Sequence, residues 1–226
     1  ALACIAIQSN QNDQHGGQSI PNFDYGMAKG VAKTYRRTYQ RNLGKAIDIL
    51  LDREDGAEIA KAAYSKLEAE GLYPVLANDN DYEKKLKAIL NSDYGIDKKL
   101  IDKILKFVLK YTSQETDRAT YQAMEALVHN LNTMHSRAGA QIPFSSINYG
   151  LDTSPEGRMV IKNVLLATEA GLGNGETPVF PIHIFRVKEG INYNEGEPNY
   201  DLFKLACRVS AKRLFPNFSF LDAPFN

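Results

Sequence analysis

The sequence predicts an α/β fold in which a largely helical region precedes a parallel sheet, and three observations lead to this prediction. Residues 23–134 carry apolar side chains every three or four positions, which is the period of a helix. After about residue 135 that period is lost, and glycine, proline, phenylalanine and asparagine become more frequent. From residue 141 on, strand-like and helix-like segments alternate. This order implies right-handed crossovers, and therefore a parallel sheet or barrel.

Local signals define the elements of the first half of the chain. Residues 1–12 begin apolar and turn polar, as at the end of a helix. The paired glycines Gly16 and Gly17 permit positive φ angles, so they predict a turn into a short strand. Helices are then predicted over 23–51, 57–70, 81–91 and 97–111.

A further helix is predicted from Thr112 to about Met134. Thr112 and Glu115 have the spacing of a capping box, in which the hydroxyl accepts from a backbone N–H and the carboxylate reaches back. The helix before it carries a row of lysines, which is either a phosphate or partner surface or a solvated face. The pattern favours the solvated face for this row, which comprises Lys99, Lys103, Lys106 and Lys110.

The second half of the chain contains the predicted sheet. Ser154, Pro155 and Glu156 supply an N-cap, a proline at the first helical position and an acidic first turn. The Gly171–Gly175 segment is glycine-rich, but it lacks the Lys-Ser/Thr pair of a phosphate loop, so it is interpreted as a connection. The expected order is a strand over 141–150, a helix from 154, a strand over 178–187, a helix over 199–214 and a strand over 217–221.

The composition excludes several classes of function. The 226 residues include 27 Lys and Arg against 27 Asp and Glu, so the formal charge of zero argues against a general DNA binder or a polybasic membrane binder. Two cysteines cannot build a disulfide framework or a four-cysteine zinc site. No apolar run reaches the roughly 18 residues of a membrane helix. The chain starts at Ala1 without a methionine or a signal peptide pattern, so we expect it to be a piece of a longer protein.

The histidines and cysteines form no metal or nucleophile pattern. His129, His135 and His183 are each expected to be structural histidines, and His15 beside the paired glycines is only slightly more suggestive. A reactive cysteine needs an electropositive, partly open site. Cys4 lies in an apolar helical run and Cys207 in the middle of a predicted helix, between Ala206 and Arg208, so both are expected to be small core residues. The spacing of residues reveals no Ser/His/Asp triad or carboxylate pair.

Two groups of polar residues are the candidates for a binding site. Three polar side chains, those of Ser145, Ser146 and Asn148, interrupt an apolar strand, where a buried polar group must find a partner. They either line a polar pocket or bond to neighbouring backbone, and the sequence leaves both possibilities open. Arg137 and Gln141 lie in the link between the long helix and this strand, where they are either nucleotide contacts or parts of a plain loop.

Several long stretches of the sequence resemble the anaerobic (class III) ribonucleoside-triphosphate reductases. The resemblance covers nearly the whole chain, is strongest from His129 onward and is looser over 45–111. Its motifs are long enough to make chance agreement implausible. They lie within Gln14–Ser19, Asn132–Gly150, Thr153–Arg158, Glu176–Ile182 and Phe215–Asp222.

The resemblance implies a slice of a ten-stranded α/β barrel with an inserted helical region. Residues 1–22 would hold the end of a helix and the first barrel strand, 23–135 the dimer and effector interface, and 136–226 further strands and crossover helices. The family reduces ribonucleoside triphosphates to deoxyribonucleotides for DNA synthesis and replication. A glycyl radical, installed by an S-adenosylmethionine iron–sulfur activase, oxidises a cysteine, which removes the ribose 3′ hydrogen. The 2′ hydroxyl leaves as water, with formate as reductant in many members.

The resemblance also assigns roles within the chain. The radical cysteine, its partner cysteine, the radical glycine and a zinc site are expected outside this segment, so no catalytic residue is expected in it and the segment alone should be inactive. Arg137 and Gln141 would carry the allosteric signal of ATP or deoxynucleotide effectors. Ser145, Ser146 and Asn148 would face the barrel lumen, and the helix N-terminus at Ser154 would hold substrate phosphate. The protein would be a cytoplasmic homodimer that binds neither nucleic acid nor membrane.

Two other functions remain open at this point. One is a non-catalytic module that binds nucleotides and dimerises through its helices. The other is a glycyl-radical enzyme that acts on a small carbon substrate, although the Ser136–Gln141 strand entry and the long helices count against it.

Overall fold

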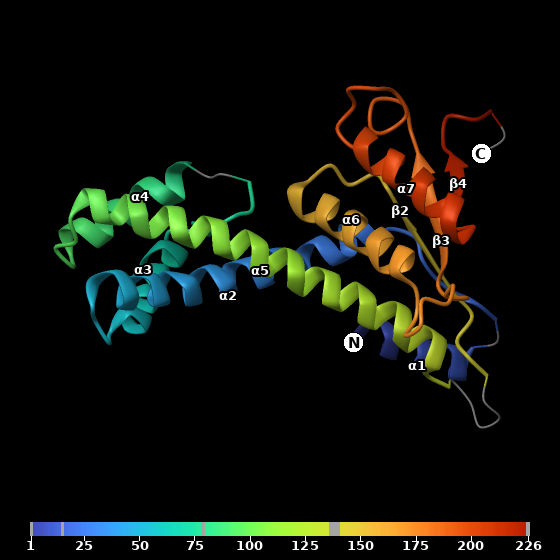
Figure 1. Ribbon diagram of the computed structural model, residues 1–226, viewed down its shortest axis with the longest axis horizontal. Coiled ribbons are helices and arrows are strands. Elements are labelled where there is room, and N and C mark those ends of the chain that lie inside the picture. The colour runs from blue at the N-terminus through green and yellow to red at the C-terminus, as the bar shows by residue number, and fades with distance from the viewer. Residues whose placement is uncertain (1, 15, 78–79, 136–140, 225–226) are drawn as a thin grey trace. The chain divides into compact units, whose positions relative to one another are not determined.

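A computed structural model describes residues 2–14, 16–77, 80–135 and 141–224, and it shows a mixed α/β chain (Figure 1). The chain divides into two compact units, a sheet unit of residues 1–29 and 120–226 and a helical unit of residues 30–119. No helix among the described residues is long and apolar enough to cross a membrane. The elements are α1 (Leu2–Asp13), β1 (Gln18–Ile20), α2 (Phe23–Leu51), α3 (Gly56–Ala69), α4 (Asn80–Ser92), α5 (Lys98–Thr133), β2 (Ser145–Tyr149), α6 (Pro155–Ala170), β3 (Ile182–Val187), α7 (Tyr200–Arg213) and β4 (Asn217–Phe220).

The sheet unit confirms the predicted parallel sheet. Its four strands pair in the order β1-β2-β3-β4, and every pair is parallel. Helix α6 connects β2 to β3, and α7 connects β3 to β4 (Figure 1). Phe203 of α7 contacts Phe185 of β3, and Thr168 of α6 bonds to His183 of the same strand, so both helices cover one face of the sheet.

Side chains alternate between the two faces of the strands. On the face that α6 and α7 cover, Ile147, Tyr149, His183 and Phe185 are almost fully buried. The opposite face is half-exposed in β2 and β3 and is mostly polar. The strand register places its residues side by side, and we call this side the polar face; it carries Ser19, Ser146, Asn148, Ile182, Ile184, Arg186, Asn217 and Ser219.

The start of α6 confirms the predicted signals, whereas the predicted break at Thr112 is wrong. The Ser154 hydroxyl accepts from the backbone N–H of Gly157 at 3.1 Å, with proline at the first helical position. In contrast, α5 runs through Thr112 without interruption. Thr112 is fully buried and its hydroxyl accepts from the Asn42 carboxamide at 3.3 Å, so its side chain bonds to α2 and does not cap a helix. Glu115 likewise accepts from Arg41 and Asn42 of α2.

The helical unit has an apolar core of its own. Helices α2, α3, α4 and α5 each contribute buried side chains to it. The rings of Tyr39 and Tyr82 meet edge-on at 5.6 Å between centroids, and such aromatic pairs stabilise a core beyond the area that they bury. The fully buried members include Tyr39, Leu43, Ile47, Leu67, Tyr82, Leu86, Leu90, Ile101 and Ile104.

Gly56, at the start of α3, lies in close contact with α2. A Cβ atom built there would overlap the Gly44 carbonyl oxygen and the Asp48 carboxylate, which accepts from the Gly56 N–H at 2.7 Å. We therefore expect Gly56→Ala to lower the free energy of unfolding by about 1–3 kcal/mol, as overpacked sites do. Urea unfolding followed by circular dichroism measures this. Gly30→Ala is the control on α2, because no atom lies within 4 Å of its added Cβ. Equal effects of the two substitutions would contradict the close-contact explanation.

Candidate functional site

The polar face carries two of the three polar strand residues that the sequence indicated. Ser146 and Asn148 lie on it, two positions apart on β2, and both are half-buried. Ser19 of β1 is in register with Ser146, so the polar strip continues onto the neighbouring strand. This arrangement agrees with the prediction that these two side chains line a polar surface.

The prediction that Ser145, Ser146 and Asn148 all lie on one face of the sheet is wrong for Ser145. Consecutive residues of a strand point to opposite faces, so Ser145 and Ser146 cannot share one. Ser145 is 3% exposed, and its hydroxyl donates to the Pro143 carbonyl at 3.3 Å. Its hydroxyl is therefore satisfied by neighbouring backbone, and the residue also borders the pocket at the start of the strand.

A pocket of about 600 Å³ lies at the amino-terminal ends of β1, β2 and β3. Gln141 lines it together with Ser145 and Ser146, so the structure brings one predicted allosteric residue beside two predicted substrate contacts. Arg137, the other predicted allosteric residue, lies outside the described residues. The apolar wall includes Phe144 and Phe180, whose rings meet edge-on at 5.0 Å. The lining is Gln11, Gly16, Gly17, Gln18, Ser19, Gln141, Phe144, Ser145, Ser146, Phe180 and Ile182.

Asp24 organises the opposite, carboxyl-terminal end of β2. Its side chain is fully buried, and one carboxylate oxygen accepts from the backbone N–H groups of Gly150, Leu151 and Asp152 at 2.9, 3.0 and 3.1 Å. Three such charge-assisted bonds hold the turn after the strand. The sequence offers no signal for this role, because an acidic residue in the first turn of a helix is ordinary.

Gly150 permits the turn that Asp24 holds. Its φ angle of +122° belongs to a region that favours glycine, and a Cβ atom would approach the Arg186 carbonyl oxygen to 2.8 Å. Its own carbonyl accepts from the carboxamides of Asn192 and Asn199 at 2.9 and 3.1 Å. The turn is thus bonded on both its N–H and its carbonyl side.

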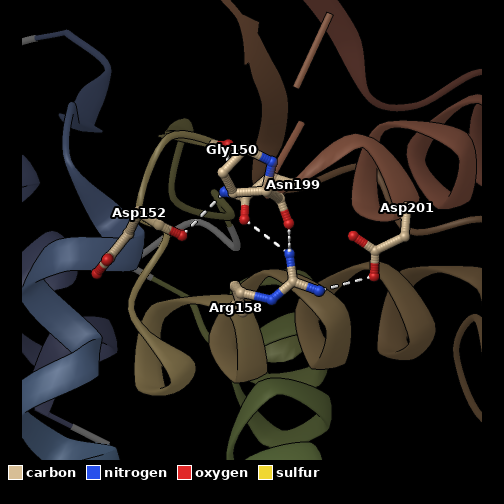
Figure 2. A network of polar contacts seen from close by, with 6 residues as sticks. Gly150, Asp152, Arg158, Asn199 and Asp201 are labelled. Atoms are coloured by element: carbon tan, nitrogen blue, oxygen red, sulfur yellow. Dashed lines mark hydrogen bonds and ion pairs between the residues drawn. The ribbon is translucent and has the colours of Figure 1, made fainter. Parts of the chain in front are cut away.

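Arg158 of α6 extends this network towards α7 (Figure 2). Its guanidinium donates to the Asn199 side-chain oxygen and pairs with Asp201, each at 2.8 Å, and it also contacts the Pro198 carbonyl. Asn199 in turn donates to the Asp152 carbonyl at 2.9 Å. The loops that follow β2 and β3 are therefore cross-linked, and we expect them to present the end of the polar face rigidly.

The environment of Ser154 argues against the predicted phosphate contact. Its hydroxyl already caps its own helix through Gly157, and its backbone N–H donates to the Asp152 carboxylate at 2.9 Å. A Cβ built on Gly157 would overlap that carboxylate, so an acidic group occupies the space in front of this helix end. An anion placed there would meet like charge.

Arg186 and Asn148 leave hydrogen-bonding atoms unused on the polar face. The Nη2 atom of Arg186 donates to the Asn22 side-chain oxygen at 2.8 Å, whereas its buried Nε has no partner among the described residues. The Asn148 side-chain oxygen is also buried without one in the described part of the chain. Tyr25 lies nearby: burial and the carboxylates of Asp152 and Asp24 raise the pKa of its phenol, and the Arg186 charge opposes them.

His183 is a buried structural histidine, as predicted. Its Nδ1 lies 3.1 Å from the Tyr149 hydroxyl and its Nε2 lies 3.2 Å from the Thr168 hydroxyl. Burial lowers the pKa of His183 to about 3. The ring is therefore neutral at physiological pH, and it lies on the helix-covered face, away from the polar face.

The two cysteines differ from each other. Cys4 is buried in α1, as predicted, and burial raises the pKa of its thiol. Cys207 is exposed on α7, so the prediction of a core residue is wrong there. Neither cysteine lies on a strand. Within the described ranges, no group of three or more His, Cys, Asp or Glu side chains is arranged to hold a metal ion.

Comparison with known proteins identifies the family. The sequence profile of the family described as anaerobic ribonucleoside-triphosphate reductase matches residues 1–226. The anaerobic ribonucleoside-triphosphate reductase of Escherichia coli K12 is 38% identical over 108 residues, which are 47% of this chain and 15% of that protein. The reductase of the same name from enterobacteria phage T4 is 37% identical over 110 residues, 48% of this chain and 18% of the phage protein. The matched segment thus spans less than a fifth of these relatives, and the profile match over all its residues shows that the chain belongs to the anaerobic ribonucleoside-triphosphate reductase family.

Proposed function

We propose that this chain is the part of an anaerobic ribonucleoside-triphosphate reductase that contributes four strands to the substrate-binding wall of a ten-stranded barrel. The whole protein would convert ribonucleoside triphosphates to deoxyribonucleoside triphosphates. The observation that carries the proposal is the family match over every residue of the chain. The polar face supports it, because half-buried polar side chains on parallel strands suit a wall that faces a polar ligand.

Ser146 and Asn148 are the substrate contacts in this proposal. A carboxamide offers an acceptor and two donors, so Asn148 is able to bond a ribose hydroxyl in either direction. Ser146 adds a hydroxyl beside the pocket at the amino-terminal ends of the strands. That pocket combines an aromatic pair with polar groups, which suits a nucleobase. Gln141, and Arg137 with it, would report the state of the effector site to this pocket.

Radical chemistry would come from other parts of the protein. A glycyl radical, installed by a radical S-adenosylmethionine activase, would generate the thiyl radical that removes the ribose 3′ hydrogen, and formate would supply the reducing equivalents. Neither Cys4 nor Cys207 lies on the strands, so this chain's residues bind and orient the nucleotide without serving as the radical thiol. Zinc would also be held in another part of the protein, as the family resemblance implies.

The helical region would serve assembly and regulation. Its helices carry a separate core, which suits a region that is able to vary without disturbing the sheet. We propose that residues 23–135 contribute to a homodimer interface at which ATP or deoxynucleotides act as effectors, in a cytoplasmic enzyme.

An activity assay on the full-length protein tests the proposal. The protein is activated anaerobically with the activase, S-adenosylmethionine and a reductant, and the glycyl radical is verified by electron paramagnetic resonance. Deoxynucleotide formation from CTP with formate is then measured. We expect turnover that depends on the radical. A protein that carries the radical and binds nucleotide but forms no deoxynucleotide would overturn the proposal in favour of another glycyl-radical reaction. Nucleotide binding without any radical would favour a non-catalytic module.

Asn148→Ala tests the polar face directly in the same assay. Removing one buried hydrogen-bonding group from a substrate contact is expected to lower kcat/KM about tenfold. Asn174→Ala is the matched control, because Asn174 is exposed in the loop after α6; the substitution removes a side-chain bond to Glu176 but keeps the bond from its backbone N–H to the same residue. Equal kcat/KM values for both variants and the parent protein would remove Asn148 from the substrate site.

A further inference from the structure

Arg186 carries a positive charge that no carboxylate neutralises in the described part of the chain. The ion pairs there join other residues, and none includes this guanidinium. Its Nε is buried and unpartnered, although it lies on a strand in the middle of the sheet. A buried donor without an acceptor costs free energy, more so on a charged group. The arrangement therefore calls for an anionic or strongly accepting group on the polar face.

The guanidinium is held in one orientation. Asn22, between β1 and α2, accepts from Nη2 at 2.8 Å. The Arg186 backbone carbonyl accepts from the Asn192 carboxamide at 2.9 Å, which fixes the strand end beneath it. A guanidinium is planar and rigid, so the bond from Nη2 to Asn22 also fixes the direction of its other N–H donors. The half-buried guanidinium is thereby held in place on the polar face, and its fork suits bonding to a planar or tetrahedral oxyanion.

The neighbours of Arg186 on the strands of the polar face are neutral polar groups, whereas Tyr25 interacts both with Arg186 and with the carboxylates of Asp24 and Asp152. Ser219 of β4 is in register with it, and Asn148 lies on the adjacent strand β2, in register with Ile184 and so two positions earlier along the sheet. The Asn148 side-chain oxygen is a buried acceptor that lacks a donor in the described structure. A ligand that presents an oxyanion to the Arg186 guanidinium and a hydroxyl to the Asn148 carboxamide would complement these two half-buried side chains.

The distance along the sheet suits an extended nucleotide. The pocket at the amino-terminal ends includes Ile182, and Arg186 lies four residues further along the same strand. At about 3.3 Å per residue this separation is about 13 Å, close to the span from a nucleobase to the terminal phosphates of a nucleoside triphosphate. Ser146, Asn148 and Arg186 follow one another along this path.

We propose that Arg186 is a phosphate-binding residue of the substrate site and that Asn22 is its positioning residue. The inference rests on the proposed function, since it takes the polar face as the place where the nucleoside triphosphate binds. It assigns the polarity of the substrate: the base lies at the amino-terminal pocket, the ribose beside Asn148, and the triphosphate at the carboxyl-terminal end of β3. The competing explanation is that a carboxylate from another segment of the longer protein pairs with Arg186.

Equilibrium binding to the full-length, unactivated protein tests the assignment, because no turnover occurs without the radical. Titrations with CTP and with cytidine are compared. For Arg186→Ala we expect the affinity for CTP to fall about tenfold to a hundredfold, with the affinity for cytidine unchanged. Arg186→Lys should bind CTP more tightly than Arg186→Ala but less tightly than the parent, because an ammonium group lacks the planar, two-donor geometry of a guanidinium. Asn22→Ala should weaken CTP binding by a smaller factor. Arg208→Ala is the matched control, since Arg208 is exposed on α7 and pairs with Glu169.

The outcomes separate this inference from the proposed function. If Arg186→Ala weakens CTP but not cytidine, the assignment holds, even if the enzyme assay later shows another reaction. If it weakens both ligands equally, or neither, Arg186 does not bind phosphate and the assignment is overturned. A loss of folding stability in Arg186→Ala with CTP affinity unchanged in the folded fraction would instead support a structural ion pair. Reductase activity with unchanged CTP binding would leave the proposed function intact and remove only this inference.

Discussion

Asp24→Ala is expected to lower the free energy of unfolding of the sheet unit by about 3–5 kcal/mol, which is a large share of the stability of most domains. The substitution removes the acceptor for the backbone N–H groups of Gly150, Leu151 and Asp152. Each buried donor left without an acceptor costs about 1–3 kcal/mol, and water that enters the gap offsets only part of the sum. The effect is measured by urea unfolding.

Two further variants isolate the cause. Asp24→Asn keeps a side-chain oxygen that accepts from the backbone but loses the charge, so its cost should lie between those of the parent and Asp24→Ala. Asp81→Ala removes an aspartate from the first turn of α4, where it is 79% exposed and makes a long ion pair with Lys84, and it should change stability by less than about 0.5 kcal/mol. If Asp24→Ala were as mild as Asp81→Ala, the turn after β2 would not depend on the carboxylate.

The role of Asp24 illustrates why the sequence predicts the elements better than the site. The strand–helix–strand order and the Ser154-Pro155 helix start are local patterns, and the structure confirms both. The bonds of Asp24 join residues more than 120 positions apart, and no local pattern contains them. A long-range bond of this kind is visible only once the sheet has brought the end of β2 next to the start of α2.

The predicted boundary at Thr112 is wrong for a related reason. Thr112 and Glu115 have the spacing of a capping box, but the same side chains also suit the interior of a long helix when a neighbouring helix supplies partners. Asn42 and Arg41 of α2 supply them, about 70 residues away in the sequence. The local capping bonds are thereby replaced by bonds to α2, and α5 continues.

The polar residues of β2 show how much of the site the alternation of side chains along a strand is able to predict. The sequence indicates Ser145, Ser146 and Asn148 as unusual in an apolar strand, and the strand alternation then separates Ser145 from the other two. Arg186 escapes notice in the sequence, because one charged residue near the end of a strand is common. It becomes significant only when the register places it on the strand next to Asn148, two positions further along, and when its Nε has no partner among the described residues.

His183 is expected to make the stability of the sheet unit depend on pH below neutrality. The Thr168 hydroxyl donates to the Val164 carbonyl at 2.7 Å, so its oxygen accepts from His183 Nε2–H. His183 Nδ1 then accepts from the Tyr149 hydroxyl, whose pKa burial raises well above its ordinary value. Both ring nitrogens are satisfied in the neutral tautomer. A second proton would sit on Nδ1 in a fully buried site, and this burial lowers the pKa of His183 to about 3.

The sign of the effect follows from this lowered pKa. Above a pH of about 6.5, the ordinary value, the ring is neutral in both the folded and the unfolded chain, and the full stability is present. As the pH falls from 6.5 towards 3, His183 becomes protonated in the unfolded chain but stays neutral in the folded chain. The free energy of unfolding therefore decreases by about 1.4 kcal/mol per pH unit. The loss is complete only when the pH passes below the folded pKa.

Urea unfolding between pH 7.5 and pH 4 measures this dependence, and the variants assign it. His183→Gln introduces a side chain that is able to donate to Thr168 and accept from Tyr149 but does not titrate. The free energy of unfolding of this variant should therefore fall less steeply with decreasing pH than that of the parent, by about 1.4 kcal/mol per pH unit. His135→Gln removes an exposed histidine and controls for the loss of one imidazole. Carboxylates titrate in the same pH range in the parent and in both variants. The contribution of His183 is therefore the difference between the variant and parent plots of unfolding free energy against pH. If the two variants change the slope equally, the buried position of His183 does not cause the pH dependence. If only His183→Gln flattens the curve, burial on the helix-covered face of the sheet keeps this histidine neutral.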